Sequence, residues 1–219
     1  MTDISAANDS QRIAVLGGTF DPVHCAHVNV ANTVYQSLAL DALYMIPCWQ
    51  SPHRELPTAS AQHRLTMLNL ALADQASLTA DARELEKQGP SYSVDTMRAL
   101  RDEHPQAQLF LIMGGDAFQH FLKWHCWQEI LTLTHLVVVK RPGYSLLDDC
   151  ADKALATLVK ERLIEGAPMT LAGSILSVAV EPSSVSATEI RSLLLKQQSA
   201  DNYLPTAVLQ YIQQHGLYQ

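Results

Sequence analysis

The chain has 219 residues, of which 47% are hydrophobic and 17% are charged, and we expect residues 1–219 to form one domain. The formal net charge of −7 argues against a protein that coats nucleic acid, because such a protein carries a strongly basic surface. No apolar run approaches the roughly 20 residues that a membrane span requires, and the scattered cysteines indicate neither a zinc cluster nor a disulfide framework.

Residues 1–11 are expected to form a loose polar tail, and the lack of a secretory signal makes a cytoplasmic location the expectation. Apolar runs then alternate with segments of helical period. The expected strands are 13–16, 43–46, 78–80, 109–113, 133–139 and 175–180, and the expected helices are 28–38, 59–73, 93–104, 187–195 and 206–214. This alternation predicts a doubly wound, Rossmann-like α/β domain with a parallel sheet and helices on both faces. Ligands bind beyond the carboxyl ends of the strands in such folds, so motifs at strand exits matter most.

The sequence GGTFDPVHCAH at 17–27 directly follows the first expected strand. Gly17 and Gly18 permit close approaches to the backbone that a side chain would block. Pro22 suits the first position of a helix, where its missing N–H group costs nothing. We therefore expect a turn and then a helix start, with room for a ligand beside the glycines.

His24 and His27 stand three residues apart and are expected on one face near the first turn of that helix. The N–H groups and the dipole of a helix start attract anions, and two imidazoles add to this, so phosphate is the expected ligand. Three other interpretations stay open. They are a dinucleotide site, although G-x-G-x-x-G is missing; a zinc site, although no third ligand is evident; and a glycine turn with incidental histidines.

Residues 183–194, SSVSATEIRSLL, begin another expected helix after the last strand. Ser186 and Glu189 form the S-x-x-E capping box that opens a helix. Arg191 lies early in this helix, where the dipole disfavours a cation by about a few tenths of a kcal/mol, and a bound anion would reverse that sign. Together with Thr188 it could hold a polyphosphate against the first helix start. The alternative is a solvated arginine on an amphipathic helix.

With both motifs in hand, the chain resembles the H-x-G-H nucleotidyltransferase superfamily and, more narrowly, the bacterial nicotinate-nucleotide adenylyltransferases. The matching stretches are GGTFDPVH at 17–24, SPHR at 51–54, HRLTML at 63–68, PSYSVDT at 90–96, IMGGDAF at 112–118, KWHCWQEIL at 123–131, VVVKRPGY at 137–144, VSATEIR at 185–191 and YIQQHGLY at 211–218. The chain departs from the family pattern at Ala26, where glycine is usual, and at Ala187, where a small hydroxyl residue is usual. Neither departure removes a charged or ring side chain, so we expect activity to survive both.

The resemblance implies transfer of the adenylyl group of ATP to nicotinate mononucleotide by direct in-line attack, giving deamido-NAD and pyrophosphate. It implies Mg²⁺ carried on the ATP phosphates, with no protein ligands to a metal. The implied partners are these two small molecules, with no nucleic acid or membrane, and no oligomer is indicated. The alternatives are a sister family that acts on nicotinamide mononucleotide or phosphopantetheine, a zinc hydrolase that uses the histidine pair, and a nucleotide-binding module without catalysis.

The resemblance also implies three sets of site residues. The catalytic set is His24, His27 and Arg191, with His27 nearest the charge that develops during transfer. The ATP set is Gly17, Gly18, Thr19, Phe20, Gly114, Asp116, Ser186 and Thr188. The set for nicotinate mononucleotide is His53, Arg54, Ser93, Trp124 and His125. Asp116 would meet the ribose or instead cap a helix, and Trp124 would stack on the nicotinate ring or instead belong to the core.

Overall fold

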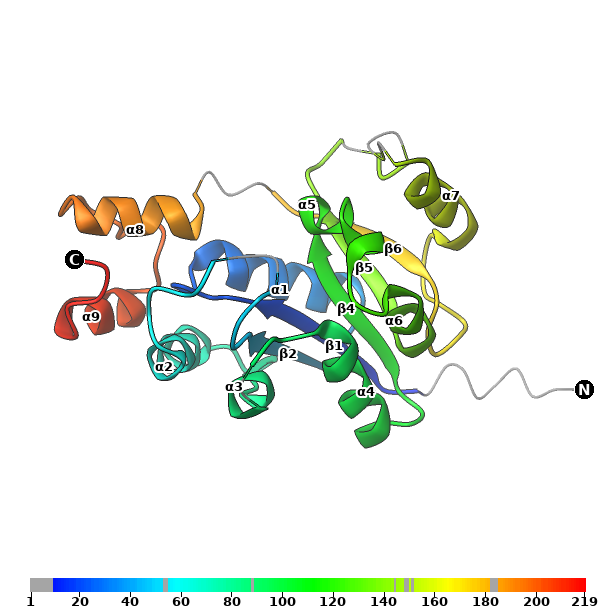
Figure 1. Ribbon diagram of the computed structural model, residues 1–219, viewed down its shortest axis with the longest axis horizontal. Helices are drawn as coiled ribbons and strands as arrows, with labels where there is room; N and C mark the ends of the chain where they lie inside the picture. The colour runs from blue at the N-terminus through cyan, green and yellow to red at the C-terminus, as the bar shows by residue number, and fades with distance from the viewer. Residues whose placement is uncertain are drawn as a thin grey trace, which may run out of the picture. The chain divides into compact units, whose positions relative to one another are not determined.

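The computed structural model describes residues 10–52, 55–87, 89–143, 145–147, 150, 152–181 and 185–219. The strands are β1 (Arg12–Gly18), β2 (Ala42–Pro47), β3 (Leu78–Ala80), β4 (Gln108–Gly114), β5 (His135–Lys140) and β6 (Ile175–Ala179). The helices are α1 (Cys25–Ser37), α2 (Ala61–Leu72), α3 (Arg83–Lys87), α4 (Ser93–Glu103), α5 (Gly115–Phe118), the 3₁₀ helix η2 (Phe121–Lys123), α6 (Trp127–Leu133), α7 (Lys153–Arg162), α8 (Ala187–Leu195) and α9 (Thr206–Gln214). Strands and helices alternate along the chain (Figure 1).

The strands form one six-stranded sheet in the order β3-β2-β1-β4-β5-β6. The pairs β1–β4, β4–β5 and β5–β6 are parallel, with Leu16 opposite Ile112 and Gly114 opposite Val139. The strand order reverses between β1 and β4, which is the arrangement of a doubly wound α/β fold. The predicted fold class is therefore confirmed. None of the helices in the described ranges is long and apolar enough to cross a membrane.

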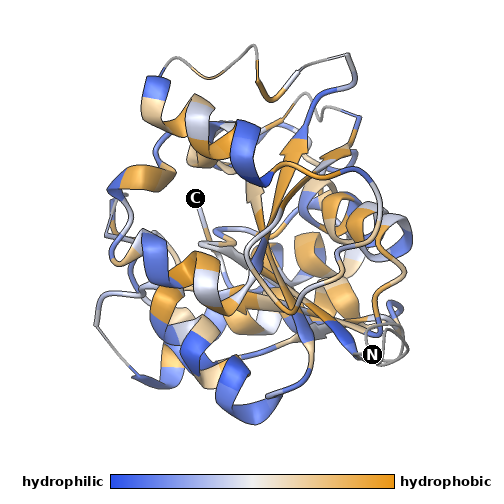
Figure 2. Ribbon diagram, turned by 90° about the vertical axis from the view of Figure 1, so that its right-hand side faces the viewer, coloured by the Kyte–Doolittle hydropathy of each residue, from blue (hydrophilic) through white to orange (hydrophobic). Residues whose placement is uncertain are grey.

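The chain divides into two compact units. The first unit comprises Met1–Leu16, Val34–Leu43 and Tyr92–Glu181, and the second comprises Gly17–Thr33, Tyr44–Ser91 and Pro182–Gln219. Hydrophobic residues run along the strands, whereas the helices carry both hydrophobic and hydrophilic residues (Figure 2). In the first unit α4 packs against β4 and α6, and in the second unit α2 packs against β3 and α9. Each unit therefore has helices packed on its strands.

Helix α1 begins between the two starts that the sequence suggests, which are Pro22 as the first helical residue and residue 28 as the first of the amphipathic stretch. It starts at Cys25, and Pro22 lies in the turn before it, after a cis Asp21-Pro22 peptide bond. The carboxylate of Asp21 accepts hydrogen bonds from the N–H groups of Thr58 and Ala59, so it does not cap a helix that starts at Pro22. The expectation that Pro22 is the first helical residue is wrong.

Helices α3, α5, α6 and α7 and the 3₁₀ helix η2 were not predicted. Helix α6 includes Leu133, the first residue of the expected strand 133–139, and β5 begins at His135 because Thr134 is the extended residue that ends the helix. All of these except α7 span seven residues or fewer, and segments this short have little hydrophobic periodicity, so packing fixes their conformation. Helix α7 spans ten residues, with Asp152 as its N-cap and Leu155 and Val159 buried, so it was missed although its sequence carries a helix signal. The longer predicted helices and the buried strands agree with the structure within a few residues at their ends.

Candidate active site

The two glycines after the first strand have different surroundings. A Cβ atom added to Gly18 would lie 2.8 Å from Cε1 of the Phe20 ring, whereas one added to Gly17 would meet no atom within 4 Å. Phe20 is buried and has a positive φ of 48°, which turns its ring back over the end of β1. The close approach that the sequence predicts is therefore intramolecular at Gly18, and Gly17 is the position with open space beside it.

His24 and His27 lie together at the start of α1. Their ring centroids are 3.8 Å apart, with 32° between the ring planes, and the Phe20 ring meets His27 edge-on at 5.1 Å. The backbone N–H of His24 donates to Nδ1 of His27 at 3.3 Å. Because Nδ1 accepts this bond, the neutral His27 ring carries its proton on Nε2. The structure thus fixes His27 as a donor through Nε2. Ala26 lies half-buried between the two histidines.

His24 is 5% exposed, and its burial lowers its pKa to about 4. The ring is therefore neutral at physiological pH, because desolvation disfavours the imidazolium. Among the described residues, Nδ1 of His24 is buried without a hydrogen-bond partner. His24 consequently contributes a neutral, desolvated ring to the site rather than a positive charge.

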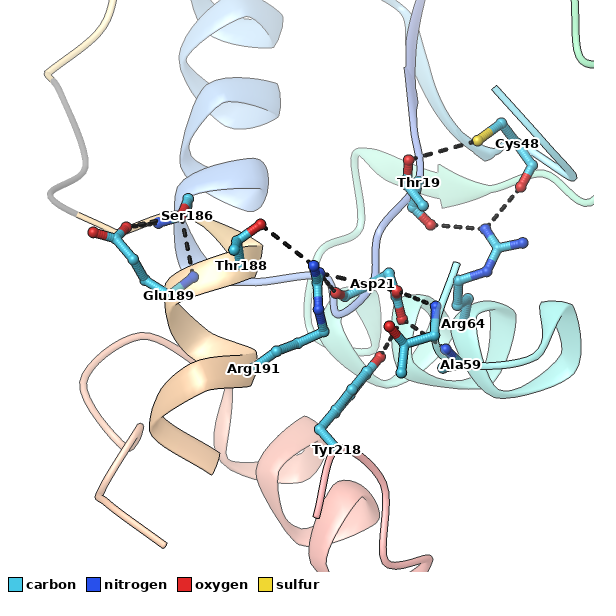
Figure 3. A network of polar contacts seen from close by, with 11 residues as sticks. Thr19, Asp21, Cys48, Ala59, Arg64, Ser186, Thr188, Glu189, Arg191 and Tyr218 are labelled. Atoms are coloured by element: carbon cyan, nitrogen blue, oxygen red, sulfur yellow. Dashed lines mark hydrogen bonds and ion pairs between the residues drawn. The ribbon is translucent and has the colours of Figure 1, made fainter. Parts of the chain in front are cut away.

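Asp21 joins the turn before α1 to the C-terminal part of the chain (Figure 3). Its buried carboxylate accepts hydrogen bonds from Thr58 N–H at 2.7 Å, Ala59 N–H at 3.0 Å and the Tyr218 hydroxyl at 2.6 Å. Its backbone carbonyl accepts a bond of 2.7 Å from Nη1 of Arg191, and this nitrogen lies 4.0 Å from the nearer carboxylate oxygen. We call these five residues the Asp21 network. They bring the Arg191 cation to the turn that carries the histidines.

The start of α8 has the predicted capping box. The Ser186 hydroxyl accepts the Glu189 N–H at 3.2 Å and donates to the Glu189 carboxylate at 2.8 Å, and the Ser186 N–H donates to the same carboxylate oxygen at 2.7 Å. The Thr188 hydroxyl accepts a bond of 3.3 Å from Nη2 of Arg191. Thr188 and Arg191 therefore act as a pair at this helix start, while the Ser186 hydroxyl is engaged in capping.

Arg64 is a residue of this region to which the sequence analysis assigns no role. It is 1% exposed, and its Nη1 donates to the carbonyls of Thr19 and Cys48 at 2.7 Å each. Its Nη2 donates to the Trp49 carbonyl at 3.4 Å. Burial lowers its pKa, and the carbonyls bind Nη1 and Nη2, while Nε is buried without a hydrogen-bond partner among the described residues. Arg64 thereby links the backbone that follows β1 to the backbone that follows β2.

A sequence signal for Arg64 exists. It precedes the buried Met67 and Leu68 by three and four residues, so it lies in the apolar stripe of α2. A charged residue in such a stripe must find partners in the interior. Asp21 and Tyr218 have no comparable signal, because 197 residues separate them in the sequence.

Gly114 and Asp116 lie in the first unit, at the carboxyl end of β4. Gly114 is exposed and is the N-cap of α5, and Asp116 lies inside the first turn of that helix with its side chain exposed. The alternative in which Asp116 is the N-cap is therefore wrong. Its carboxylate is left facing solvent just beyond a central strand.

The residues predicted for nicotinate mononucleotide lie partly in the first unit. Ser93 begins α4, and the ring of its neighbour Tyr92 lies 4.7 Å from that of His125, so the structure brings this helix start and His125 together. Trp124 is half-buried, with its ring 5.8 Å from that of Phe121. His53 and Arg54 lie outside the described residues.

No cluster of three or more His, Cys, Asp or Glu side chains that could hold a metal ion occurs in the part of the chain that the structure describes. The predicted site residues that are described fall into two groups. The second unit holds the glycines, Thr19, Phe20, the histidine pair, Ser186, Thr188 and Arg191, and the first holds Gly114, Asp116, Ser93, Trp124 and His125. The second-unit group has the hydrogen-bond donors that an anion needs.

Comparison with known proteins adds two kinds of finding, and the first comes from sequence. Residues 15–193 match the family model described as cytidylyltransferase-like. A relative from Acidithiobacillus ferrooxidans, named a probable nicotinate-nucleotide adenylyltransferase, is 44% identical over 210 residues, covering 94% of this chain and 95% of the relative. A relative of the same name from Pseudomonas syringae is 43% identical over 213 residues, covering 95% of this chain and 94% of the relative.

The second kind of finding comes from solved structures. The nicotinic acid mononucleotide adenylyltransferase of Plasmodium falciparum, complexed with NaAD, superposes with a TM-score of 0.71 at 16% identity and covers 95% of this chain. The same protein complexed with APC gives a TM-score of 0.70. The match extends over 97% of that chain in both cases. At this level of identity the likeness supports the fold.

Proposed function

This chain belongs to the nicotinate-nucleotide adenylyltransferase family, and we propose that it transfers the adenylyl group of ATP to nicotinate mononucleotide, with deamido-NAD and pyrophosphate as products. One structural observation supports the proposal in addition to family membership. His24 and His27 flank the start of α1, and Arg191 is bonded to the turn that precedes them through the Asp21 carbonyl. Two imidazoles and a guanidinium gathered at one turn suit a triphosphate.

The proposed reaction is a direct in-line displacement. A phosphate oxygen of nicotinate mononucleotide attacks the α-phosphorus of ATP, a new P–O bond forms, and the bond to the bridging oxygen breaks as pyrophosphate leaves. Such a reaction needs positioning and charge neutralisation rather than a protein nucleophile. In our proposal Nε2–H of His27 donates to an α-phosphate oxygen, and its tautomer is already set by the His24 N–H.

The remaining phosphate contacts follow from the same arrangement. We assign Arg191 and Thr188 to the β- and γ-phosphates, because the Arg191 guanidinium has five N–H donors and among the described residues gives two of them to protein acceptors. The backbone of Gly18, Thr19 and Phe20 would lie along the triphosphate. Glu189 engages both the hydroxyl and the backbone N–H of Ser186, so Ser186 would contribute by capping α8, the helix that carries Thr188 and Arg191.

Mg²⁺ fits this site as an ion carried on the ATP phosphates. The side chains gathered here are hydrogen-bond donors, and the Asp21 carboxylate already accepts three short hydrogen bonds, so it offers little to a cation. When bound, the ion would neutralise phosphate charge. The protein's part is to orient the triphosphate and to stabilise the leaving pyrophosphate.

We assign the other substrate groups by family resemblance together with exposure. Gly114 and the exposed Asp116 would meet the adenosine ribose, for which a carboxylate is a suitable acceptor. The half-buried Trp124 would stack on the nicotinate ring, and backbone N–H groups near Ser93 and His125 would accept its carboxylate. His53 and Arg54 would bind the mononucleotide phosphate. We also propose that residues 1–219 act as one catalytic domain in the cytoplasm.

A comparison of substrates tests the proposal. The purified protein with ATP, Mg²⁺ and nicotinate mononucleotide should form deamido-NAD and pyrophosphate in equal amounts, as measured by chromatography and a coupled phosphate assay. Faster turnover of nicotinamide mononucleotide or phosphopantetheine would assign the chain to a sister activity. Tightly bound stoichiometric zinc that is lost with His27 would support a hydrolase instead, and ATP binding without any turnover would support a binding module.

A further inference from the structure

The Asp21 network places a buried carboxylate beside the proposed phosphate-binding cation with only a long, single-oxygen ion pair between them. The Asp21 side chain is 5% exposed, and Nη1 of Arg191 lies 4.0 Å from its Oδ2. A guanidinium so close to a buried carboxylate would ordinarily form short, paired hydrogen bonds with it. Here Arg191 donates instead to the backbone carbonyl of Asp21 at 2.7 Å.

Three other donors account for this arrangement. Oδ2 of Asp21 accepts from Thr58 N–H, and Oδ1 accepts from Ala59 N–H and from the Tyr218 hydroxyl, the shortest of the three at 2.6 Å. Burial, together with this hydrogen bond, raises the pKa of Tyr218, so the hydroxyl stays protonated and donates throughout the physiological range. Tyr218 is the only side chain among the three donors, so its contribution can be removed by one substitution.

We propose that Tyr218 is a positioning residue for Arg191: by occupying Oδ1 of Asp21 it prevents a short ion pair in which the guanidinium would bind both carboxylate oxygens, and it leaves the guanidinium to bind the ATP phosphates. An Arg191 paired with Asp21 would have to break that pair before it could bind phosphate, and substrate binding would weaken accordingly. The inference rests on the proposed function, because it takes the phosphates of ATP as the anion that Arg191 binds. It adds a residue to which the sequence motifs assign no part in the reaction.

The test is the Tyr218→Phe variant, which keeps the ring and removes the hydroxyl. We expect the KM for ATP and the Kd for inorganic tripolyphosphate to rise about three- to tenfold, the range that a hydrogen bond of ordinary net strength supports. We expect the KM for nicotinate mononucleotide to stay the same and kcat to change less than the KM for ATP. Tyr211→Phe is the matched control, because it removes another hydroxyl of the C-terminal segment, one that shares a 2.9 Å hydrogen bond with His63.

A double-variant cycle separates positioning from a general loss of structure. In the Arg191→Ala background, Tyr218→Phe should leave the Kd for tripolyphosphate unchanged, because there is no guanidinium to redirect. An equal effect in both backgrounds, an unchanged Kd in the single variant, or the same effect from Tyr211→Phe would overturn the inference. A wild-type protein that binds tripolyphosphate but forms no deamido-NAD would contradict the proposed function alone, and the binding cycle would still decide the role of Tyr218.

Discussion

His24 and His27 lie in contact at the start of one helix, yet their environments give them different chemical states. His24 is buried and neutral, with a pKa of about 4, and its backbone N–H rather than its ring sets the tautomer of its neighbour. His27 is half-buried and is fixed as an Nε2 donor. A spacing of three residues predicts that both rings share a helix face. Only the structure shows that the two rings are in contact and that the His24 N–H sets the tautomer of His27.

Replacing His27 with Ala removes the proposed donor to the α-phosphate. We expect kcat/KM for both substrates to fall by about 100-fold or more, the usual loss when a hydrogen bond to developing charge is deleted. The far-UV circular dichroism and thermal midpoint should stay close to those of the wild type, because the ring is not in the core. His120→Ala, at an exposed histidine of the first unit, is the control. A decrease below about fivefold would argue against a role for His27 in the transition state.

Among the elements, α2 contributes most to the geometry of the site without lying in it. Its first residues follow the Ser60 cap, and Arg64 on its inner face reaches the carbonyls that follow β1 and β2. The backbone of residues 19 and 48 therefore depends on one side chain from a helix. An amphipathic helix here is predictable from sequence, whereas the three carbonyls that Arg64 meets are not.

Arg64→Met keeps most of the volume of this side chain and removes its donors. We expect the free energy of unfolding, measured by urea denaturation, to fall by about 3 kcal/mol or more, because buried carbonyls lose their partner. Arg98→Met is the matched control, since Arg98 pairs with Glu129 and Asp95 at the exposed surface. That substitution should cost much less, because solvent screens exposed ion pairs. Equal losses in the two variants would show that the carbonyl contacts do not stabilise the fold.

Long elements and short ones differ in how far sequence predicts them. The run 109–113 is apolar at every position, so β4 could be predicted from hydrophobicity alone, and the S-x-x-E pattern marks the start of α8. The helix α5 spans four residues and α3 five, which is too few for a periodic signal. The start of α1 was misplaced because Asp21 binds backbone N–H groups some 37 residues away rather than capping its own helix.

At the scale of the whole molecule, two buried histidines make stability depend on pH. His135 lies in the interior of the first unit, where Nδ1 accepts the Ser174 N–H and Nε2 donates to the Thr170 carbonyl. Burial lowers its pKa to about 4, as it does for His24 in the second unit. In the unfolded chain both would titrate near 6.5, the ordinary value for histidine. The native state therefore binds fewer protons than the unfolded state between these two values.

We expect the contribution of these two histidines to the free energy of unfolding to be constant at pH values well above 6.5 and to decrease as the pH falls from 6.5 to 4. Each of the two histidines contributes up to about 1.4 kcal/mol per pH unit in this window. Urea denaturation at pH 7, 5.5 and 4.5 measures the slope. His135→Gln should reduce it, because glutamine cannot be protonated there, whereas the exposed His120→Ala should not. A His135→Gln protein with the wild-type slope would contradict the assignment.

Sequence motifs predicted the local parts of the site, and the contacts between distant parts had to come from the structure. The glycines, the histidine pair and the capping box each lie within one short segment, so spacing alone indicates what they can do. These segments are linked through the Asp21 carbonyl, the Arg191 guanidinium and the Tyr218 hydroxyl. These three residues lie far apart in the chain, and no sequence pattern indicates that they are in contact. The sequence therefore predicted which segments carry the candidate donors, but not the network that links those segments.

The Asp21 network also has a consequence for how the chain folds. Asp21 meets Arg191 across 170 residues of sequence and Tyr218 across 197. Closing loops of that size costs chain entropy before any contact forms, whereas the helices and the strand pairs β4–β5 and β5–β6 need much shorter loops. The network is thus expected to assemble last during refolding. A molecule with most of its sheet in place would still lack the arrangement that we propose to bind a triphosphate.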